Sequence, residues 1–347
     1  MKHFRFSILF TVLALVGMYI WGYTQGGVDH AIKLFFITLL LAFMEVSFSF
    51  DNAVVNASIL KTWNHFWKTM FLTIGMLIAV FGMRLVFPLL IVSYTADVSM
   101  QMVWFVAIHN PVEYSMLLTE HHGEISAFGG MFLLLVFLNF LIDNEKTLHW
   151  FKFIEKELSN LGRINTLPTL ISLFVLVNVI FGVPKEHQFA ILFSGVWGII
   201  TFLGVKIIGE LLESKHEEKY LAMSNIAKGG IGAFIYLEVL DASFSFDGVI
   251  GAFAITTDII TIMVGLGIGA FFVRSITIYL VEQGTLDDYV YLEHGAHYAI
   301  GILAILMLIG INYHHIPEVI TGLVGIAFIL WSFYSSKKYM AKNLNRK

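Results

Sequence analysis

Long apolar stretches alternate with short polar connections along almost the whole chain. Stretches of spanning length, on the order of 17–25 residues, fall at about residues 6–22, 31–60, 69–93, 125–142, 166–182, 189–211, 229–256, 259–283, 294–312 and 316–335. Helices are the expected form, because a lipid-embedded helix satisfies its backbone hydrogen bonds internally. The pattern therefore predicts an all-α polytopic membrane protein with about ten transmembrane helices, in a range of about 9–11.

Composition supports a lipid bilayer as the main partner of this chain. The 347 residues are 58% hydrophobic and 13% charged, with a mean hydropathy of +0.80. The net charge of −4 comes without a basic patch that would suit nucleic acid, and no glycine-rich phosphate loop is present. Cysteine is absent, which excludes disulfides, thiolate metal sites and cysteine nucleophiles. We expect a single membrane domain over residues 1–347, and no enzyme.

Basic residues predict how the helices are oriented. They gather in alternate connections, around Lys61, in Lys146–Arg163, in Lys215–Lys228 and in the C-terminal tail, and are almost absent from the others. Because cytoplasmic connections carry the excess of lysine and arginine, both termini are expected in the cytoplasm. We expect the protein in a bacterial inner membrane.

Two connecting segments are expected to lie at the membrane surface. Residues 94–124 are apolar but contain Pro111, which predicts an interfacial or re-entrant helix on the outer face with a break before the proline. Residues 143–165 mix charges with aromatic residues, which predicts an amphipathic cytoplasmic helix over Glu145–Leu158. Glu293, His294 and His297 border a predicted span and are expected to contact lipid headgroups.

An acidic motif occurs twice inside the apolar stretches. The sequences MEVSFSFDNAVVNA (Met44–Ala57) and LEVLDASFSFDGVIGA (Leu237–Ala252) share SFSFD, each with an acid six residues before the final aspartate. Ionisable residues inside a membrane are costly and are candidates for a functional site. In the predicted topology the two motif helices run in opposite directions. This favours an inverted repeat of three-helix units, residues 31–142 and 229–312, with the site near the membrane midplane.

The motif supplies only oxygen ligands, which suit hard divalent cations such as Mn²⁺ or Ca²⁺ rather than copper or zinc. The candidate metal ligands are Glu45, Asp51, Asn52, Glu238, Asp241 and Asp247. The supporting polar residues are Ser47, Ser49, Asn56, Ser243 and Ser245, and each motif helix is followed by a helix with one arginine, Arg84 or Arg274. The ion is expected as substrate, with no resident cofactor.

The geometry of an ideal helix leaves one question open. Asp51 lies about 120° from Glu45 around such a helix, so either the helix opens locally or Asp51 approaches the site from another side. A bound cation and burial act on carboxylate protonation in opposite directions, so exchange of the ion for protons is a hypothesis.

Other interpretations of the same residues remain. Glu45 and Arg84 alone could form a structural ion pair. The protein could export another small solute such as an amino acid, or act as a non-transporting scaffold with cytoplasmic stress-resistance proteins. An intramembrane aspartyl protease would pair Asp51 with Asp247, but FSFDG is not the GxGD element that such enzymes usually show.

The motifs resemble those of the TerC family, in the LysE/TerC-type exporter group. The resemblance rests on MEVSFSFDNAVV, on LEVLDASFSFDGVIGAFAIT, on the arginine helix from Gly267 and on GGMFLLLVFLNF from Gly129. It implies inverted three-helix units, efflux of manganese or calcium, and a link to tellurium resistance. It also implies an ion site with Glu45, Asp51 and Asn52 in one half and Glu238, Asp241 and Asp247 in the other. The chain departs from the family in its greater length and in Gly248, where serine is common, which indicates a long bacterial branch of unassigned function.

Overall fold

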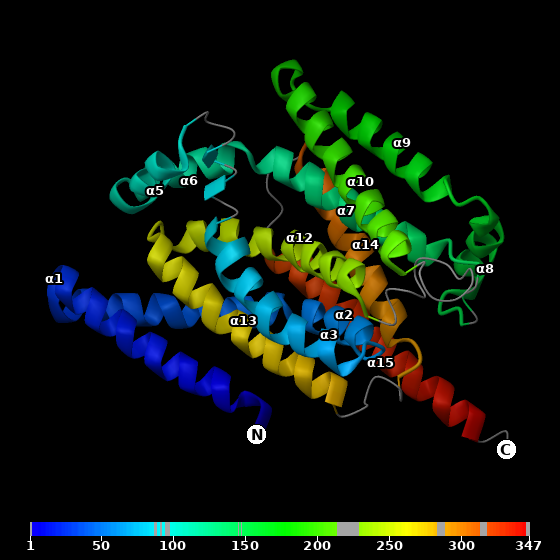
Figure 1. The fold of residues 1–347 in the computed structure, drawn as a ribbon, viewed down its shortest axis with the longest axis horizontal. Coiled ribbons are helices and arrows are strands. Elements are labelled where there is room, and N and C mark those ends of the chain that lie inside the picture. The colour runs from blue at the N-terminus through cyan, green and yellow to red at the C-terminus, as the bar shows by residue number, and fades with distance from the viewer. Residues whose placement is uncertain are drawn as a thin grey trace. The chain divides into compact units, whose positions relative to one another are not determined.

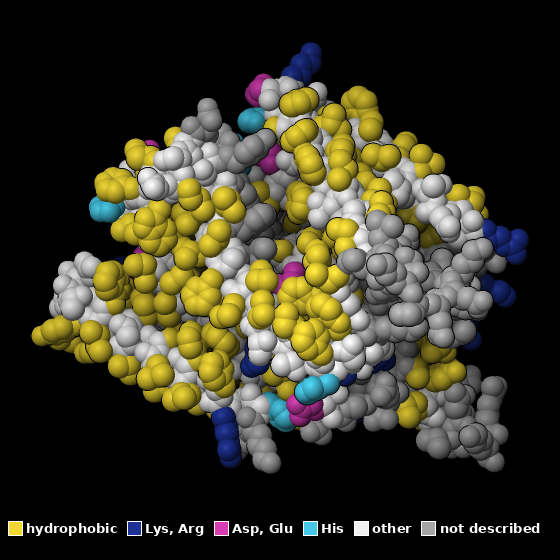
Figure 2. Space-filling view, in the orientation of Figure 1, with side chains coloured by type: hydrophobic (Ala, Val, Ile, Leu, Met, Phe, Trp, Pro, Cys, Tyr) yellow, Lys and Arg dark blue, Asp and Glu magenta, His cyan; other side chains and the backbone are white. Residues whose placement is uncertain are grey.

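The computed structural model describes residues 2–86, 89–90, 92–93, 98–144, 146, 148–213, 229–282, 289–312 and 318–344. Within these residues helices are the only regular secondary structure (Figure 1), so the all-α prediction is confirmed. Hydrophobic side chains cover much of the face drawn in Figure 2.

Six of the described helices are long and apolar enough to cross a membrane, which is consistent with a membrane protein. They are Arg5–Ser47, His65–Val86, His122–Leu141, Lys185–Ile208, Ile259–Glu282 and Leu292–Gly310. A bent helix pair, Lys152–Arg163 with Leu167–Phe181, would make a seventh span. The larger number of spans and the inverted repeat remain predictions.

The chain folds into two compact units that interleave along the sequence. Residues 1–57, 64–121 and 244–283 form the first unit, and residues 58–63, 122–243 and 284–347 form the second. Each unit is described by itself.

The first unit begins with a helical hairpin. Helix α1 (Arg5–Phe48) leaves helical geometry at Gly26 and Gly27, and Gly27 has a φ of 76° that favours glycine. A Cβ atom at Gly22 would lie 2.8 Å from the Cα atom of Ala31, so the two arms of α1 touch just beside the turn. The arms correspond to the apolar stretches predicted at 6–22 and 31–60, and α2 (Phe50–Leu60) continues the second arm.

Helix α13 (Ile259–Glu282) packs along α1 in this unit (Figure 1). Helix α3 (His65–Met70) leads into two π-helical segments, η2 (Phe71–Gly75) and η3 (Ile78–Val86), and η3 also packs against α13. Segments of π-helix are rare in proteins, and those that occur are often found at functional sites. Helices α5 (Met100–His109) and α6 (Pro111–Glu120) are separated at Asn110, which confirms the predicted break before Pro111.

Helix α7 (His122–Leu141) forms the core of the second unit, and most of its side chains are buried. It packs against α10 (Lys185–Glu213), α14 (Leu292–Gly310) and α9 (Leu167–Phe181). Helix α15 (Glu318–Leu344) packs on α14. Helix α12 (Ile231–Ile255) carries the second acidic motif, and its residues up to Ser243 belong to this unit.

The amphipathic connection is shorter as a helix than predicted. Helix α8 (Lys152–Asn160) begins at Lys152 rather than at Glu145, and a turn of 3-10 helix, η4 (Leu161–Arg163), follows it. The main-chain N–H groups of Trp150 and Phe151 donate instead to the carboxylate of Glu155. The carboxylate of Glu155 thus accepts hydrogen bonds from backbone N–H groups at the start of the helix, where these groups have no acceptor within the helix.

Candidate functional site

The first acidic motif lies at the junction of two helices. Glu45 is in the last turn of α1, Ser49 interrupts the helix, and Phe50 begins α2. The N–H group of Ser49 still donates to the carbonyl of Glu45, at 2.9 Å. The first motif thus has a break in helical geometry at Ser49 with the hydrogen bonds on either side kept, whereas α12 runs without interruption through the second copy.

Glu45 is almost completely enclosed, with 2% of its surface exposed. Its Oε1 atom accepts a hydrogen bond of 3.0 Å from the hydroxyl of Ser49 and forms an ion pair with the guanidinium of Arg84. The other terminal nitrogen of Arg84 donates to the carbonyl of Ala79 in η3, at 2.6 Å. The charge of Glu45 is thus compensated by Arg84, which also fits the interpretation of a structural pair.

Two glycines bring other helices against Glu45. A Cβ atom at Gly248, in the second motif, would lie 3.1 Å from Oε2 of Glu45. A Cβ atom at Gly269 of α13 would overlap the Cβ atom of Glu45. Gly248 follows the SFSFD of the second motif directly, so the structure brings the two motifs together at this point within the first unit.

Replacing Gly269 by alanine should displace Glu45, because the new methyl group would overlap its side chain. We expect the free energy of unfolding to fall by about 1–3 kcal/mol, as for other overpacked sites. Gly267→Ala is the matched control, because a Cβ atom there would meet Val80 at an ordinary contact distance of 3.4 Å. Thermal unfolding of the two purified variants in detergent gives the comparison. Equal unfolding midpoints would contradict the close packing of α13 on Glu45.

The other residues of the first motif are also buried. Asp51, Asn52 and Asn56 lie on α2 with little exposure. The N–H group of Asn52 donates to Oδ1 of Asp51 at 3.0 Å. Ser47 instead donates to the carbonyl of Phe43 one turn earlier. The structure thus gathers Glu45 and Ser49 around Arg84, while the hydroxyl of Ser47 is bonded to the backbone.

The second motif contributes a carboxylate, that of Glu238, with one unsatisfied oxygen. Oε1 of Glu238 is buried and receives no hydrogen bond from any described residue. Ser243 donates to the carbonyl of Val239. The side chains of Ser245 and Asp247 lie outside the described part of the chain.

Arg274 does not repeat the arrangement of Arg84. Its Nε atom donates to the carbonyl of Leu72 in η2, and no ion pair joins it to a described carboxylate. Each arginine nevertheless donates to a carbonyl of a π-helical segment, Arg84 in η3 and Arg274 in η2. The two side chains therefore both hold the helix that carries Arg84.

No three aspartate, glutamate or histidine side chains in the described part of the chain gather as a metal-binding group. The side chain of Asp247 is outside this set. The complete predicted site of six ligands thus stays a prediction.

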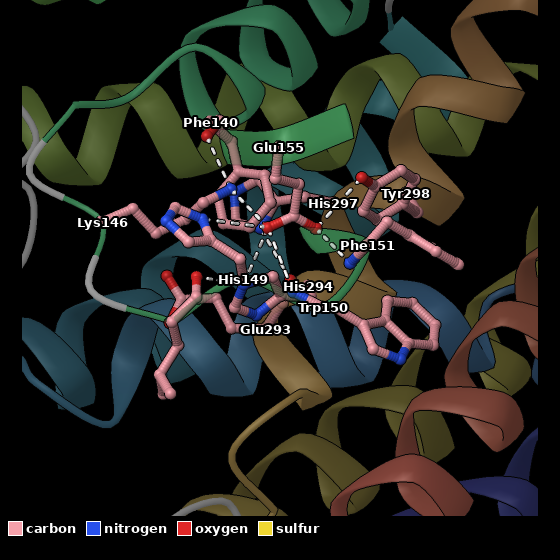
Figure 3. Close-up of polar contacts among 11 residues, drawn as sticks. Phe140, Lys146, His149, Trp150, Phe151, Glu155, Glu293, His294, His297 and Tyr298 are labelled. Carbon is pink, nitrogen blue, oxygen red and sulfur yellow. Dashed lines mark hydrogen bonds and ion pairs between the residues drawn. The ribbon is translucent and has the colours of Figure 1, made fainter. Parts of the chain in front are cut away.

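A second polar centre, which the sequence did not predict, lies in the second unit (Figure 3). We call Lys146, His149, Glu155, His294 and Tyr298 the Glu155 cluster. Glu155 has no exposed surface, and its Oε2 atom lies 3.1 Å from Nζ of Lys146, 3.5 Å from Nε2 of His294 and 3.6 Å from Nδ1 of His149. Its Oε1 atom accepts hydrogen bonds of 3.1 Å from the hydroxyl of Tyr298 and from the N–H group of Phe151.

These donors decide the protonation of Glu155. Burial opposes the charged form, but the hydrogen bonds from His294 and Phe151 and the charge of Lys146 outweigh it and hold the pKa of Glu155 well below its usual range. Burial lowers the pKa of Lys146, and the charge of Glu155 opposes this effect. The cluster is therefore a buried ion pair in which Glu155 is well supplied with donors, whereas Nδ1 of His149 and Nδ1 of His294 make no hydrogen bond with any described residue.

The expected headgroup contacts of His294 and His297 are wrong, because both side chains are buried. Nε2 of His294 donates to the carbonyl of Leu148 at 3.0 Å, and the ring of His297 stacks on Phe140. The signal in the sequence was an acid, Glu155, directly after the apolar residues Phe153 and Ile154. Nothing in the sequence linked it to the histidines.

The fold and these buried charges define an all-helical protein with several helices suited to crossing a membrane. The chain belongs to the DUF475 family, described as proteins of unknown function, whose family profile matches residues 50–344. No curated protein and no solved structure matches the chain. The matched region begins just before Asp51 and includes the whole second motif and the Glu155 cluster.

Proposed function

We propose that this protein is a membrane transporter that exports a divalent metal cation of manganese or calcium type, in exchange for protons. The observation that carries the proposal is the buried Oε1 atom of Glu238, which no described donor reaches although Asp241 lies three residues away. A buried carboxylate oxygen without a donor is unfavourable unless a proton or a cation occupies the position. A transported cation and a counter-transported proton would meet this need alternately.

The repeated motif supports the same proposal. Glu45 and Asp51 are buried in the first unit, and Glu45 adjoins Gly248 of the second motif. The six-ligand site, the inverted repeat, about ten spans with both termini in the cytoplasm, and the resemblance to the TerC family belong to this proposal. So does the bacterial inner membrane as its location.

Metal accumulation in cells that produce or lack the protein tests the proposal. Cells with the protein should hold less manganese or calcium, and Asp51→Asn, Asp247→Asn and Glu238→Gln should each remove the difference while the folded protein is still present. Glu157→Gln, at an exposed acid on α8, is the control and should export normally. If manganese, calcium and magnesium all accumulate equally with and without the protein, metal export is excluded.

A second function is favoured by one observation. Oε1 of Glu45 forms an ion pair with Arg84, as it would in a structural pair. A non-transporting scaffold in metal or tellurium resistance would use the acids in this way. In that case variants of the acidic motif would still restore resistance to a deletion strain.

A further inference from the structure

Helix α8 turns one acidic side chain, Glu155, inward and two large apolar side chains, Phe153 and Ile154, outward. Glu155 has 0% of its surface exposed, whereas its neighbours Phe153 and Ile154 are 88% and 52% exposed. If water surrounded α8, both features would be unfavourable. The carboxylate of Glu155 loses its hydration on burial, and the side chains of Phe153 and Ile154 leave apolar surface exposed to water. The arrangement is favourable where the medium outside α8 is itself apolar.

The bend into α9 sets the direction of α8 relative to that helix. The segment Lys152–Arg163 and helix α9 meet at 109°. Helix α9 is strongly apolar and exposes Leu170, Phe174 and Phe181, as a lipid-facing helix does. With α9 directed into the bilayer, a helix that bends away by 109° lies nearly parallel to the surface, at the depth where α9 begins.

The charges around the exposed apolar side chains indicate which lipids it meets. Lys152, Lys156 and Arg163 are exposed on this segment, against one exposed acid, Glu157. Basic residues beside an inserted apolar face are attracted to anionic headgroups. We propose that Lys152–Ile164 is a docking surface for anionic phospholipids, with Phe153 and Ile154 inserted below the headgroups and the basic residues contacting their phosphates. This proposal does not depend on metal transport.

The Glu155 cluster fixes the rotation of α8 about its own axis. Glu155 is held by Lys146 from the preceding connection and by Tyr298 from α14. The bonds from Trp150 and Phe151 tie the start of the helix to the same carboxylate. Phe153 and Ile154 are therefore presented outward before any lipid is bound.

The absence of cysteine allows a direct test on the full chain. Phe153→Cys and Ile154→Cys variants, each labelled with an environment-sensitive fluorophore, are reconstituted into phosphatidylcholine vesicles with or without phosphatidylglycerol. Both labels should be quenched by a lipid-borne nitroxide and protected from iodide, and phosphatidylglycerol should increase the lipid quenching. Neutralising Lys152→Gln and Lys156→Gln together should remove that increase.

Two reference labels make the result decisive. A label at Asn144→Cys, exposed in the same connection, should be quenched by iodide, and a label at Phe174→Cys on α9 should be quenched from the lipid phase. Iodide quenching at positions 153 and 154 equal to that at 144 overturns the membrane docking. Equal lipid quenching in vesicles with and without phosphatidylglycerol overturns the preference for anionic headgroups.

Discussion

Replacing Glu155 by alanine should destabilise the protein by about 3–5 kcal/mol, the usual cost of removing one partner from a buried ion pair. The substitution leaves the ammonium of Lys146 without its counter-ion. It also leaves the amide protons of Trp150 and Phe151 and the hydroxyl of Tyr298 without their acceptor. Thermal unfolding in detergent should show this loss as a lowered midpoint.

Two variants separate the buried charge from a general effect on α8. Glu157→Gln changes an exposed acid on the same helix and should stay within about 0.5 kcal/mol of the parent protein. Glu155→Gln should fall in between, because its oxygen can still accept from Phe151 and Tyr298 although it gives Lys146 no charge. If Glu155→Ala unfolded at the same midpoint as Glu157→Gln, the cluster would have no role in stability.

The pH dependence of this effect follows from the lowered pKa of Glu155. Burial alone would raise the pKa, but the bonds from His294 and Phe151 and the charge of Lys146 lower it below the unfolded value of about 4.3. A group of this kind stabilises the folded state above the unfolded pKa and loses this contribution as the pH falls through the folded pKa. The difference between the parent protein and Glu155→Ala should thus be constant from about pH 6 to 8 and shrink only in strong acid.

The features that the sequence predicted correctly are those with a local physical cause. The apolar stretches are long enough to require helices, and the glycine pair at Gly26 and Gly27 permits the turn between the first two. Pro111 disfavours helical geometry at the residue before it, and the break at Asn110 follows. The ion pair of Glu45 with Arg84 had been only one of the interpretations of these residues, which rested on two opposite charges in apolar helices.

The features that the sequence did not predict depend on contacts between distant segments. Glu155 and Tyr298 are 143 residues apart, and no local pattern joins them. The aromatic and charged residues near Glu145 fit an ordinary amphipathic helix, so the non-helical residues before Lys152 could not be foreseen. The π-helical segments η2 and η3 were likewise not predicted, and within them the carbonyls of Leu72 and Ala79 accept hydrogen bonds from Arg274 and Arg84.

Exchanging Arg84 for methionine should cost about 3–5 kcal/mol, because it leaves the carboxylate of Glu45 buried without its counter-ion. Glu45→Gln alone should also destabilise the protein, since it leaves the guanidinium of Arg84 uncompensated. The double variant removes both charges together, and most of the stability should return. Thermal unfolding of the parent, the two single variants and the double variant gives the coupling free energy of the pair.

The same four proteins also decide whether Glu45 belongs to the ion site. If Glu45 only neutralises Arg84, cells that produce the double variant, Glu45→Gln with Arg84→Met, should export metal as cells with the parent protein do. If Glu45 is a ligand, as proposed, the double variant should be stable and yet leave cellular manganese or calcium as high as in cells without the protein. Recovery of stability together with recovery of export would remove Glu45 from the site and leave Asp51, Glu238, Asp241 and Asp247 as its acids. Gly248 would then adjoin Glu45 only for packing, since a Cβ atom there would lie 3.1 Å from its Oε2 atom.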